Sequence, residues 1–339
     1  MRTRVGINGM GQTGRALLRL VSDHPDRAFE VVAVNDAMPP ATLAHLLRHD
    51  SPARPPGRIE TGRGRLAVDG QPIQLLAEPD PAAPPWGDLG VDIVIDAAGG
   101  VRTADRVAAH LAAGARKVVL AGPNRAAEVT VVVGINEDDY LPAEHRVIAN
   151  SSGAAACVAA AVSVLHRGFG IRRGVVTTVR GDTDDDLWPD ESRRDRGRSP
   201  GRPSAIIPTS SELISSLDAA APELAGRLTG LALRVPAAET SIIDLTVQLN
   251  EVTTPGQVNR AFADAAARRL KSILRYSTEP LVSSDLVGDP ASCVIDGGLT
   301  TTSGTLVKVF GWYDQLTGPA NRTVELVDLV ARTLPEVRS

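Results

Sequence analysis

The fold of this chain is decided near its start, where Thr3 to Arg15 read TRVGINGMGQTGR. The first six of these residues have the apolar composition of a buried strand, three glycines follow, and the apolar spacing of a helix begins at Arg15. The next apolar run, Phe29 to Val34, ends in Asn35 and Asp36. Strand, glycines, helix, strand and acid, in that order, predict a βα dinucleotide-binding unit.

The physical logic of such a site predicts which residues bind the cofactor. Glycines let the backbone approach a pyrophosphate at the positive end of a helix, and the acid accepts hydrogen bonds from the ribose hydroxyls. Asp36 would repel a 2′-phosphate, so we expect NAD rather than its 2′-phosphorylated form. The alternative is that the glycines only form a tight turn. The predicted NAD-binding residues here are Asn8, Gly9, Gly11, Gln12, Thr13, Gly14 and Asp36.

Length and composition limit the classes of protein. The chain has 339 residues, 43% of them hydrophobic, which is enough for two domains with their own cores. A net charge of -4, without long runs of one sign, argues against nucleic acid and membrane surfaces as partners. Two cysteines are too few for a disulfide framework, and the N-terminus lacks the apolar core of a signal peptide. We therefore expect a cytoplasmic protein and predict no metal site.

The order of the predicted elements indicates an α/β protein with two domains. Up to Asn150, strands alternate with helices, which predicts an N-terminal Rossmann-type domain with a doubly wound parallel sheet, residues 1–151. An alanine-rich helix follows from Gly153 to His166, and longer alternating strands come after it. They predict a C-terminal α+β domain with a mixed or antiparallel sheet, residues 152–317. We also expect an exposed loop over 184–202, a helix over 257–274 and a last helix over 320–334.

Many landmarks in order resemble the glyceraldehyde-3-phosphate dehydrogenase family over essentially the whole chain. They include RVGINGMGQTGR, VVAVND, PWGDLGVDIVID, AGARKVVLAGP, PELAGRLTGLALRVP, SIIDLTVQL and WYDQLTGPANR. The resemblance implies an NAD-binding first domain and a catalytic second domain whose sheet mediates contacts. It also implies a final helix, within residues 318–339, that packs back on the first domain, and a homotetramer.

The resemblance breaks at the catalytic residues of the family. The cysteine that attacks the aldehyde has Gly153 at its position, and the histidine that acts as its base has Arg180. An arginine stays protonated and cannot accept a proton. Cys157 matches the family's second, non-nucleophilic cysteine, which favours a buried inert thiol. Ser152 is better explained as a helix N-cap than as a nucleophile.

Around this position, an anion site is partly retained by resemblance. Ser152, Thr183 and Arg234 match the family, Ser211 stands in place of a threonine, and Glu212 replaces a glycine. With Gly153, which stands at the cysteine position, Ser152, Thr183, Ser211 and Arg234 are the predicted anion-binding residues. At the nicotinamide end, Gly99 is retained and Gln315 replaces an asparagine. Arg180 and Asp182 share one strand face. Either they belong to a solvated loop start, or they form a pair that binds a substrate or acts in acid–base catalysis.

Two functions remain open from these residues. The first is an NAD-dependent enzyme repurposed in specialised metabolism, which acts without a thioester on a small anionic or phosphorylated substrate or on the dinucleotide itself. The second is an inactive NAD-binding pseudoenzyme with a regulatory or structural role. An ordinary phosphorylating dehydrogenase needs a nucleophile that the sequence lacks.

Overall fold

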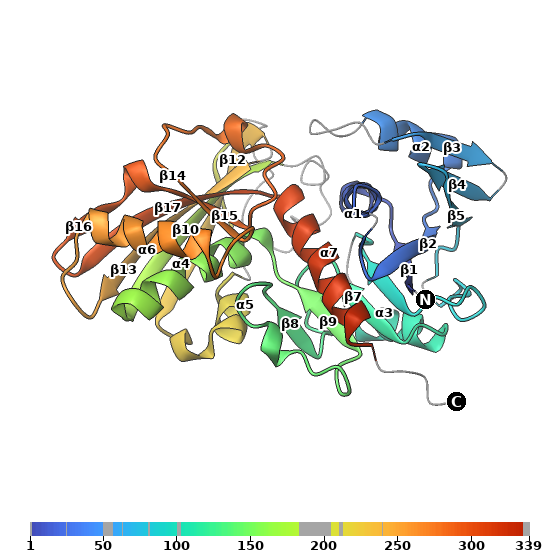
Figure 1. Ribbon diagram of the computed structural model, residues 1–339, viewed down its shortest axis with the longest axis horizontal. Helices are drawn as coiled ribbons and strands as arrows, with labels where there is room; N and C mark the ends of the chain where they lie inside the picture. The colour runs from blue at the N-terminus through green and yellow to red at the C-terminus, as the bar shows by residue number, and fades with distance from the viewer. Residues whose placement is uncertain are drawn as a thin grey trace. The chain divides into compact units, whose positions relative to one another are not determined.

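A glycine-rich turn joins the first strand, β1 (Thr3–Asn8), to the first helix, α1 (Gln12–Ser22). The computed structural model describes the chain except residues 1, 25, 50–56, 63, 81, 100–102, 183–204, 210–212, 239 and 335–339, and the side chains of Asp182 and Ala238. The chain divides into two units, Met1–Ser151 with Pro319–Ser339, and Ser152–Gly318. Figure 1 shows the elements of each unit.

The first unit is built on a nine-stranded sheet with the order β3-β4-β5-β2-β1-β6-β7-β9-β8. All neighbours pair in parallel except β3 with β4 and β4 with β5. This is the predicted Rossmann-type sheet, extended by an antiparallel edge. Its further elements are β2 (Phe29–Asn35), α2 (Pro40–His49), β3 (Ile59–Gly62), β4 (Arg65–Val68), β5 (Gln71–Leu76), β6 (Ile93–Asp96), α3 (Ala104–Ala112), β7 (Lys117–Leu120), β8 (Val129–Val131) and β9 (Val147–Asn150).

Apolar side chains cover both faces of this sheet. On β6, Ile93 and Ile95 join the core cluster that contains residues of α1, whereas Val94 joins a second cluster around the buried Trp86. Continuous apolar strands of this kind are typical of parallel sheets buried on both faces. The carboxyl ends of β1, β2 and β6 therefore meet at one edge, where α/β sheets bind ligands.

The last helix, α7 (Thr317–Arg332), packs into the core of the first unit. Val324 and Val327 join the cluster that contains Val5 of β1. The side-chain amide of Asn150, at the end of β9, donates to the Pro319 carbonyl at 3.1 Å and to the Thr323 hydroxyl at 2.9 Å. The end of the chain thus returns to the unit in which it began.

The second unit contains a mixed sheet with the order β11-β12-β10-β13-β17-β15-β14, and β16 pairs with β17. β10 pairs with β12 in parallel and with β13 antiparallel. The unit has the mixed sheet that the sequence predicts. Its elements are α4 (Gly153–Phe169), β10 (Ile171–Asp182), β11 (Ile207–Thr209), α5 (Leu213–Ala220), β12 (Leu228–Ala238), β13 (Thr240–Leu249), α6 (Pro255–Ala267), β14 (Leu274–Ser277), β15 (Cys293–Asp296), β16 (Thr301–Ser303) and β17 (Leu306–Asp314).

Helices α4 and α6 lie along one side of this sheet (Figure 1). The inward positions of the strands, such as Thr178 and Ile243, are buried against them, while Val175 on the other face is 55% exposed. The alternation of a half-buried sheet is therefore clear in β10, as its period of two predicts.

One predicted element is wrong at its end. The helix expected over 257–274 is α6, which begins at Pro255 and ends at Ala267, and Leu274 already belongs to β14. Arg268 leaves helical geometry, and Ser272 has a φ of +71°, which a continuing right-handed helix does not allow. The loop predicted over 184–202 lies outside the described residues. In the part of the chain that the structure describes, no helix combines the length and apolarity that crossing a bilayer requires.

Candidate functional site

The turn between β1 and α1 has the geometry of a phosphate-binding loop. Gly9 has a φ of +93°, and a Cβ there would lie 2.5 Å from the Cα of Ala98. A Cβ on Gly14 would lie 2.0 Å from the Gly9 carbonyl oxygen. These two glycines therefore bring the turn, the helix and the segment after β6 into close contact. Only glycine fits at either place without a shift of the backbone.

Gly11 has a different role because it faces open space. A Cβ there would meet no described atom within 4 Å, and its φ of −63° is ordinary for any residue. Gly11 is the N-cap of α1, and no side-chain hydrogen bond caps this helix. The first amides of α1, including those of Gln12 and Thr13, thus lie at a positive helix terminus that suits an anion. These residues fit the pyrophosphate of a dinucleotide.

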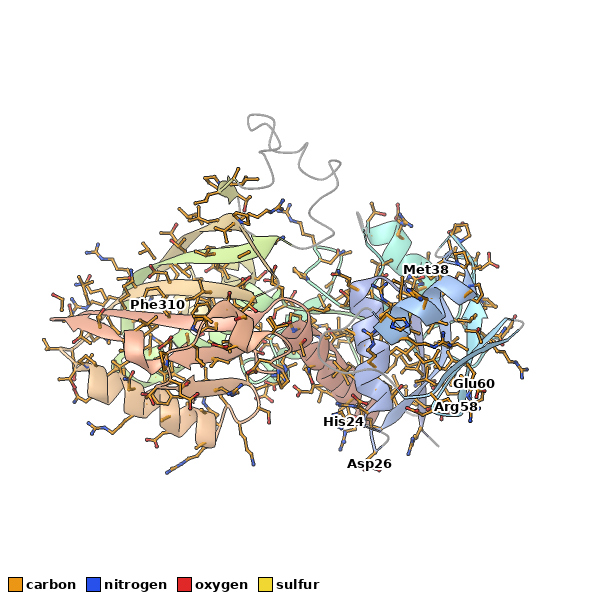
Figure 2. The ribbon with its side chains drawn as sticks, turned by 90° about the horizontal axis from the view of Figure 1, so that it is seen from above. His24, Asp26, Met38, Arg58, Glu60 and Phe310 are labelled. Atoms are coloured by element: carbon orange, nitrogen blue, oxygen red, sulfur yellow. The ribbon has the colours of Figure 1, made fainter. Side chains whose placement is uncertain are left out.

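Asp36, at the end of β2, holds the same turn from the side. Its carboxylate accepts hydrogen bonds from the amide of Met10 at 2.6 Å and from the amide of Met38 at 2.8 Å. Figure 2 labels Met38, which lies between Asp36 and α2. Two carboxylate oxygens offer about four acceptor positions, so the side chain keeps capacity for ribose hydroxyls. The acid that the sequence singled out thus also fixes the loop.

Asn8 and Gly99 complete the predicted dinucleotide residues of the first unit. Asn8 is buried, and its side chain bonds to Asn35 and Asp96 inside the protein. Gly99 is exposed and lies three residues after Asp96. A Cβ added to Gly99 would have no described atom within 4 Å. The structure therefore brings together the predicted residues of this unit, with Asn8 beneath the surface that the others form.

In the second unit, the N-terminus of α4 is the corresponding feature. Ser152 is its N-cap, and its hydroxyl oxygen accepts the amide hydrogen of Ala155 at 3.1 Å, which confirms the capping role predicted for it. Gly153 is the first residue of the helix, and both residues are half-buried. The helix dipole gives this end a partial positive charge.

Two arginines lie side by side on the neighbouring sheet. Arg180 of β10 is the register partner of Arg234 of β12, so their side chains leave the same face. One residue past the Val179–Ile242 pair, Arg180 comes opposite Ser241, which is itself the partner of Tyr313 on β17. Ser241 and Tyr313 are buried. The four side chains form a row across the sheet, and this row lies on its inner face.

Electrostatics agree with this placement. Burial raises the pKa of the Tyr313 phenol, while Arg180 acts in the opposite direction and Cys157 adds to the increase. Tyr313 is buried on β17, the strand that packs against α4. Its proton stays on the oxygen at neutral pH, so Tyr313 is a hydrogen-bond donor in this row.

Cys157 is the thiol nearest in sequence to Gly153, one turn further along α4. It is fully buried, and burial raises its pKa well above the usual value. Its sulfur and that of Cys293 both border Gly311. A thiol in this environment stays protonated and unreactive, as the sequence predicted.

Gln315 uses its side chain within the second unit. Its Nε2 donates a hydrogen bond to the Gly181 carbonyl oxygen at 3.0 Å, directly after Arg180. The preceding Asp314 accepts hydrogen bonds from the amides of Gly288, Leu316 and Thr317, which fixes this bend of the chain. Gln315 thus ties the end of β17 to the end of β10.

Three predicted site residues cannot be placed. Thr183 and Ser211 lie outside the described residues, as does Glu212, and only the backbone of Asp182 is described, at the end of β10. Among the described residues, no group of three or more His, Cys, Asp or Glu side chains could hold a metal ion.

Sequence reasoning missed a buried polar cluster beneath the dinucleotide loop. Asp96, His110 and Trp86 form it together with two asparagines. The signal was present at Asp96, because a carboxylate at the end of an otherwise apolar strand needs partners when buried. His110 gave no such signal, since it lies in a helix of ordinary amphipathic pattern.

The parallel sheet and the open N-terminus of α1 define a dinucleotide-binding protein with a second, mixed-sheet unit. Two family models match the chain: the NAD binding domain of glyceraldehyde 3-phosphate dehydrogenase over residues 3–104, and the C-terminal domain of the same enzyme over residues 152–315. The chain belongs to the glyceraldehyde-3-phosphate dehydrogenase family. Its first unit is the NAD-binding one.

Known members of the family match over almost the full length. The chain is 43% identical over 335 residues to glyceraldehyde-3-phosphate dehydrogenase 2 of Streptomyces arenae, covering 98% of this chain and 100% of the relative. It is 41% identical over 333 residues to the glyceraldehyde-3-phosphate dehydrogenase of Geobacillus stearothermophilus, covering 98% and 99%. The similarity thus spans both units.

Proposed function

We propose that this chain is an NAD-dependent oxidoreductase that binds a small anionic substrate through Arg180 and Arg234 and acts without a cysteine thioester. The observation that carries the proposal is the register of these two arginines on the inner face of the second sheet. Like charges directly opposite on neighbouring strands are unfavourable. A carboxylate or phosphate would accept hydrogen bonds from both side chains, because a guanidinium fork matches both groups in geometry.

The absence of a cysteine nucleophile and a histidine base at the family's positions supports the proposal that the reaction proceeds without a thioester. By resemblance to the family, Gly153 stands at the position of the nucleophilic cysteine and Arg180 at that of the histidine base. Cys157 is buried, with a raised pKa, and offers no substitute. A thioester needs a thiolate within reach of the substrate. Hydride transfer to NAD by a plain alcohol–carbonyl interconversion needs none.

The residues of the second unit have clear tasks under this proposal. Arg180 and Arg234 would bind the anionic group of the substrate, and the first amides of α4 would add hydrogen bonds at the positive helix end. Asp182, Thr183 and Ser211 stay predictions as further contacts. NAD supplies the hydride-accepting ring when it is bound in the first unit.

The proposal is tested by incubating purified protein with NAD or NADH and a panel of phosphorylated and carboxylated metabolites, followed by mass spectrometry of the small molecules. We expect one anionic metabolite to gain or lose two hydrogens with matching interconversion of NAD and NADH. Cleavage or modification of NAD alone would instead make the dinucleotide the substrate. Binding of an anion without any conversion would support the pseudoenzyme, and either outcome would refute the oxidoreductase.

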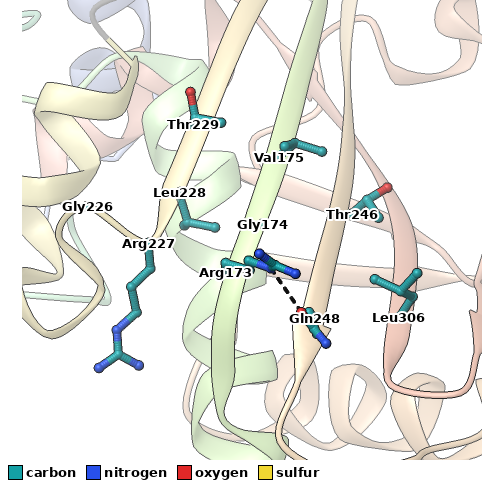
Figure 3. Close-up of a pocket in the computed structure, with 10 residues that line it drawn as sticks. All are labelled: Arg173, Gly174, Val175, Gly226, Arg227, Leu228, Thr229, Thr246, Gln248 and Leu306. Atoms are coloured by element: carbon teal, nitrogen blue, oxygen red, sulfur yellow. Dashed lines mark hydrogen bonds between the residues drawn. The ribbon is translucent and has the colours of Figure 1, made fainter.

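Assembly is a separate proposal, resting on the family resemblance and the outer face of the second sheet. This face exposes Val175, Leu231 and Leu306 at 55%, 47% and 48%. It also holds a shallow hollow of about 330 Å³, in which Arg173 donates to Gln248 at 3.0 Å (Figure 3). We propose that a second copy of the chain covers this face in a homotetramer. A cytoplasmic location and a role in specialised metabolism stay predictions from the sequence.

A further inference from the structure

A hydrogen-bonded series of buried polar side chains lies beneath the dinucleotide loop of the first unit. Asn35, Asn8 and Asp96 lie at the carboxyl ends of β2, β1 and β6, and His110 of α3 and Trp86 extend the series. His110 is 1% exposed and Trp86 is fully buried. Buried polar groups of this kind cost free energy unless each donor finds an acceptor.

The backbone fixes the direction of every hydrogen bond from one end. The amide of Glu78 donates to Asn35 Oδ1 at 2.8 Å, and Asn35 Nδ2 donates to the Glu78 carbonyl at 2.9 Å. Asn35 Nδ2 therefore also donates to Asn8 Oδ1, at 2.8 Å. That leaves Asn8 Nδ2 to donate to Asp96 Oδ1, at 3.2 Å. Neither the Asn35 nor the Asn8 side-chain amide can exchange its oxygen and nitrogen positions without breaking one of these hydrogen bonds.

The indole fixes the direction from the other end. Trp86 Nε1 can only donate, and it does so to His110 Nδ1 at 3.2 Å. The neutral imidazole must then carry its proton on Nε2, which lies 3.5 Å from Asn8 Nδ2. Both of these nitrogens are then donors and do not bond to each other; Asn8 Nδ2 donates to Asp96 Oδ1, and the same carboxylate acts electrostatically on His110. His110 is thus locked in one tautomer between a donor and an acid.

This series connects directly to the residues that bind the dinucleotide. Asp96 Oδ1 also accepts the amide hydrogen of Ala98 at 3.1 Å, and Ala98 is the residue against which Gly9 packs. Asn8 immediately precedes Gly9, and Asn35 immediately precedes Asp36. A shift of the His110 ring would therefore displace Asn8 and Asp96, which hold the two sides of the phosphate-binding turn.

We propose that His110 is a positioning residue for NAD, whose neutral form holds the dinucleotide loop and whose protonation loosens it. Protonation would make Nδ1 a donor that faces the donor of Trp86, so the bond between them must break. The inference deepens NAD binding by the first unit and does not depend on the reaction proposed for the second.

The charges around His110 set the direction of the pH effect. Burial lowers the pKa of His110, Asp96 on β6 opposes that decrease, and Arg106 on the same helix adds to it. Asn8 and Trp86, the other partners, do not titrate. An unfolded histidine has a pKa of about 6.5. The protein should therefore keep its full stability above about pH 6.5 and lose it as the pH falls through the lower folded pKa. NAD affinity compares two folded states, so it should fall only as the pH drops through that folded pKa.

The experiment compares NAD binding by calorimetry from about pH 8 downward, over the pH range in which the protein stays folded, for the full-length protein and two variants. His110→Gln keeps a donor and an acceptor but cannot titrate. His24→Gln is the matched control, because His24, labelled in Figure 2, is exposed and follows the C-terminal end of α1, whereas the dinucleotide loop precedes its N-terminal end. The second readout is the indole N–H resonance of Trp86 in NMR, assigned with Trp86→Phe.

We expect the unmodified protein and His24→Gln to lose NAD affinity as the pH falls below the folded pKa of His110, by up to about tenfold for each pH unit. His110→Gln should change less than about twofold over the same range. The Trp86 resonance should move over the same pH range as the affinity. An equal pH dependence in His110→Gln, or a Trp86 resonance that does not move with the affinity, would overturn the proposal.

A second variant keeps the test decisive if His110→Gln does not fold. Trp86→Phe removes the opposing donor but leaves His110 in place. Protonation then breaks no hydrogen bond, so the ring of His110 should titrate at a higher pH, as followed by its own NMR signals. An unchanged titration of His110 in this variant would also count against the proposal.

Discussion

Arg180 and Arg234 are register partners on adjacent parallel strands of the second unit, with both side chains half-buried on the same face. Two cations in this relationship repel each other, and water screens them less than it would on the surface. Under the proposed function, a bound anion accepts hydrogen bonds from both guanidinium groups. The register of β10 and β12 thus places the two guanidinium groups that we propose to bind the anionic substrate on one face of the sheet.

Substituting Arg180 should separate anion binding from NAD binding. In Arg180→Met, we expect affinity for inorganic phosphate or a phosphorylated substrate to fall at least about tenfold, because charge-assisted hydrogen bonds contribute roughly 1.5 to 3 kcal/mol. NAD affinity, measured by calorimetry, should stay within about twofold. The control is Arg173→Met, on the outer face of the same strand. Equal anion affinity in Arg180→Met and Arg173→Met would show that Arg180 does not hold the anion.

The two glycines of the dinucleotide turn should respond differently to alanine. Gly14→Ala places a Cβ against the Gly9 carbonyl oxygen and should lower the free energy of unfolding by about 1 to 3 kcal/mol. Gly11→Ala enters open space and should leave stability within about 0.5 kcal/mol. It should nevertheless weaken NAD binding roughly tenfold, since it fills the space over the first amides of α1.

Denaturant unfolding and calorimetry on the same preparations check this pair. The geometry of the turn would be contradicted by a Gly14→Ala protein as stable as the original. A Gly11→Ala protein with unchanged NAD affinity would exclude the pyrophosphate from the end of α1.

Asp36 should determine the preference for NAD over its 2′-phosphorylated form. Asp36→Asn removes the charge that repels a 2′-phosphate, so we expect the ratio of the two dissociation constants to move toward one by about tenfold or more. The control, Asp26→Asn, changes an exposed acid of the same unit that Figure 2 also labels. Tighter binding of the 2′-phosphorylated cofactor by the unmodified protein would refute the role given to Asp36.

The outer face of the second sheet should control assembly. Leu231→Asp places a charge on the exposed apolar face and should reduce the mass seen by light scattering from that of a tetramer to that of a smaller species. Val252→Asp, at a position 74% exposed after the end of β13, is the control and should leave the mass unchanged. A tetramer that survives Leu231→Asp would place its interface elsewhere.

The first unit could be predicted from its sequence because each signal there is local. Buried strands of a parallel sheet read as continuous apolar runs, and the glycines and Asp36 mark the turn between them. The antiparallel edge of β3, β4 and β5 was missed, since short strands at a sheet edge carry few apolar residues. Helix α6 was extended too far because Leu270 and Leu274 continue its apolar spacing after the backbone has turned.

The candidate sites show where sequence reasoning ends. Gly153 and Arg180 were identified from the resemblance, but their relation to Ser241 and Tyr313 follows from strand register, which depends on pairing between distant segments. His110 looked like an ordinary helix residue, and its environment is set by contacts 24 and 102 residues away in the chain. Such contacts leave no local pattern.

The central claim, that this family member acts without a thioester, is tested most directly by intact-protein mass spectrometry. The protein is mixed with NAD and glyceraldehyde 3-phosphate, without inorganic phosphate, while NADH is followed by its absorbance. We predict an unmodified protein mass and no NADH, and little more for Gly153→Cys, because Arg180 cannot shuttle the protons that follow. A stable acyl adduct on the unmodified protein, formed together with one equivalent of NADH, would contradict the account.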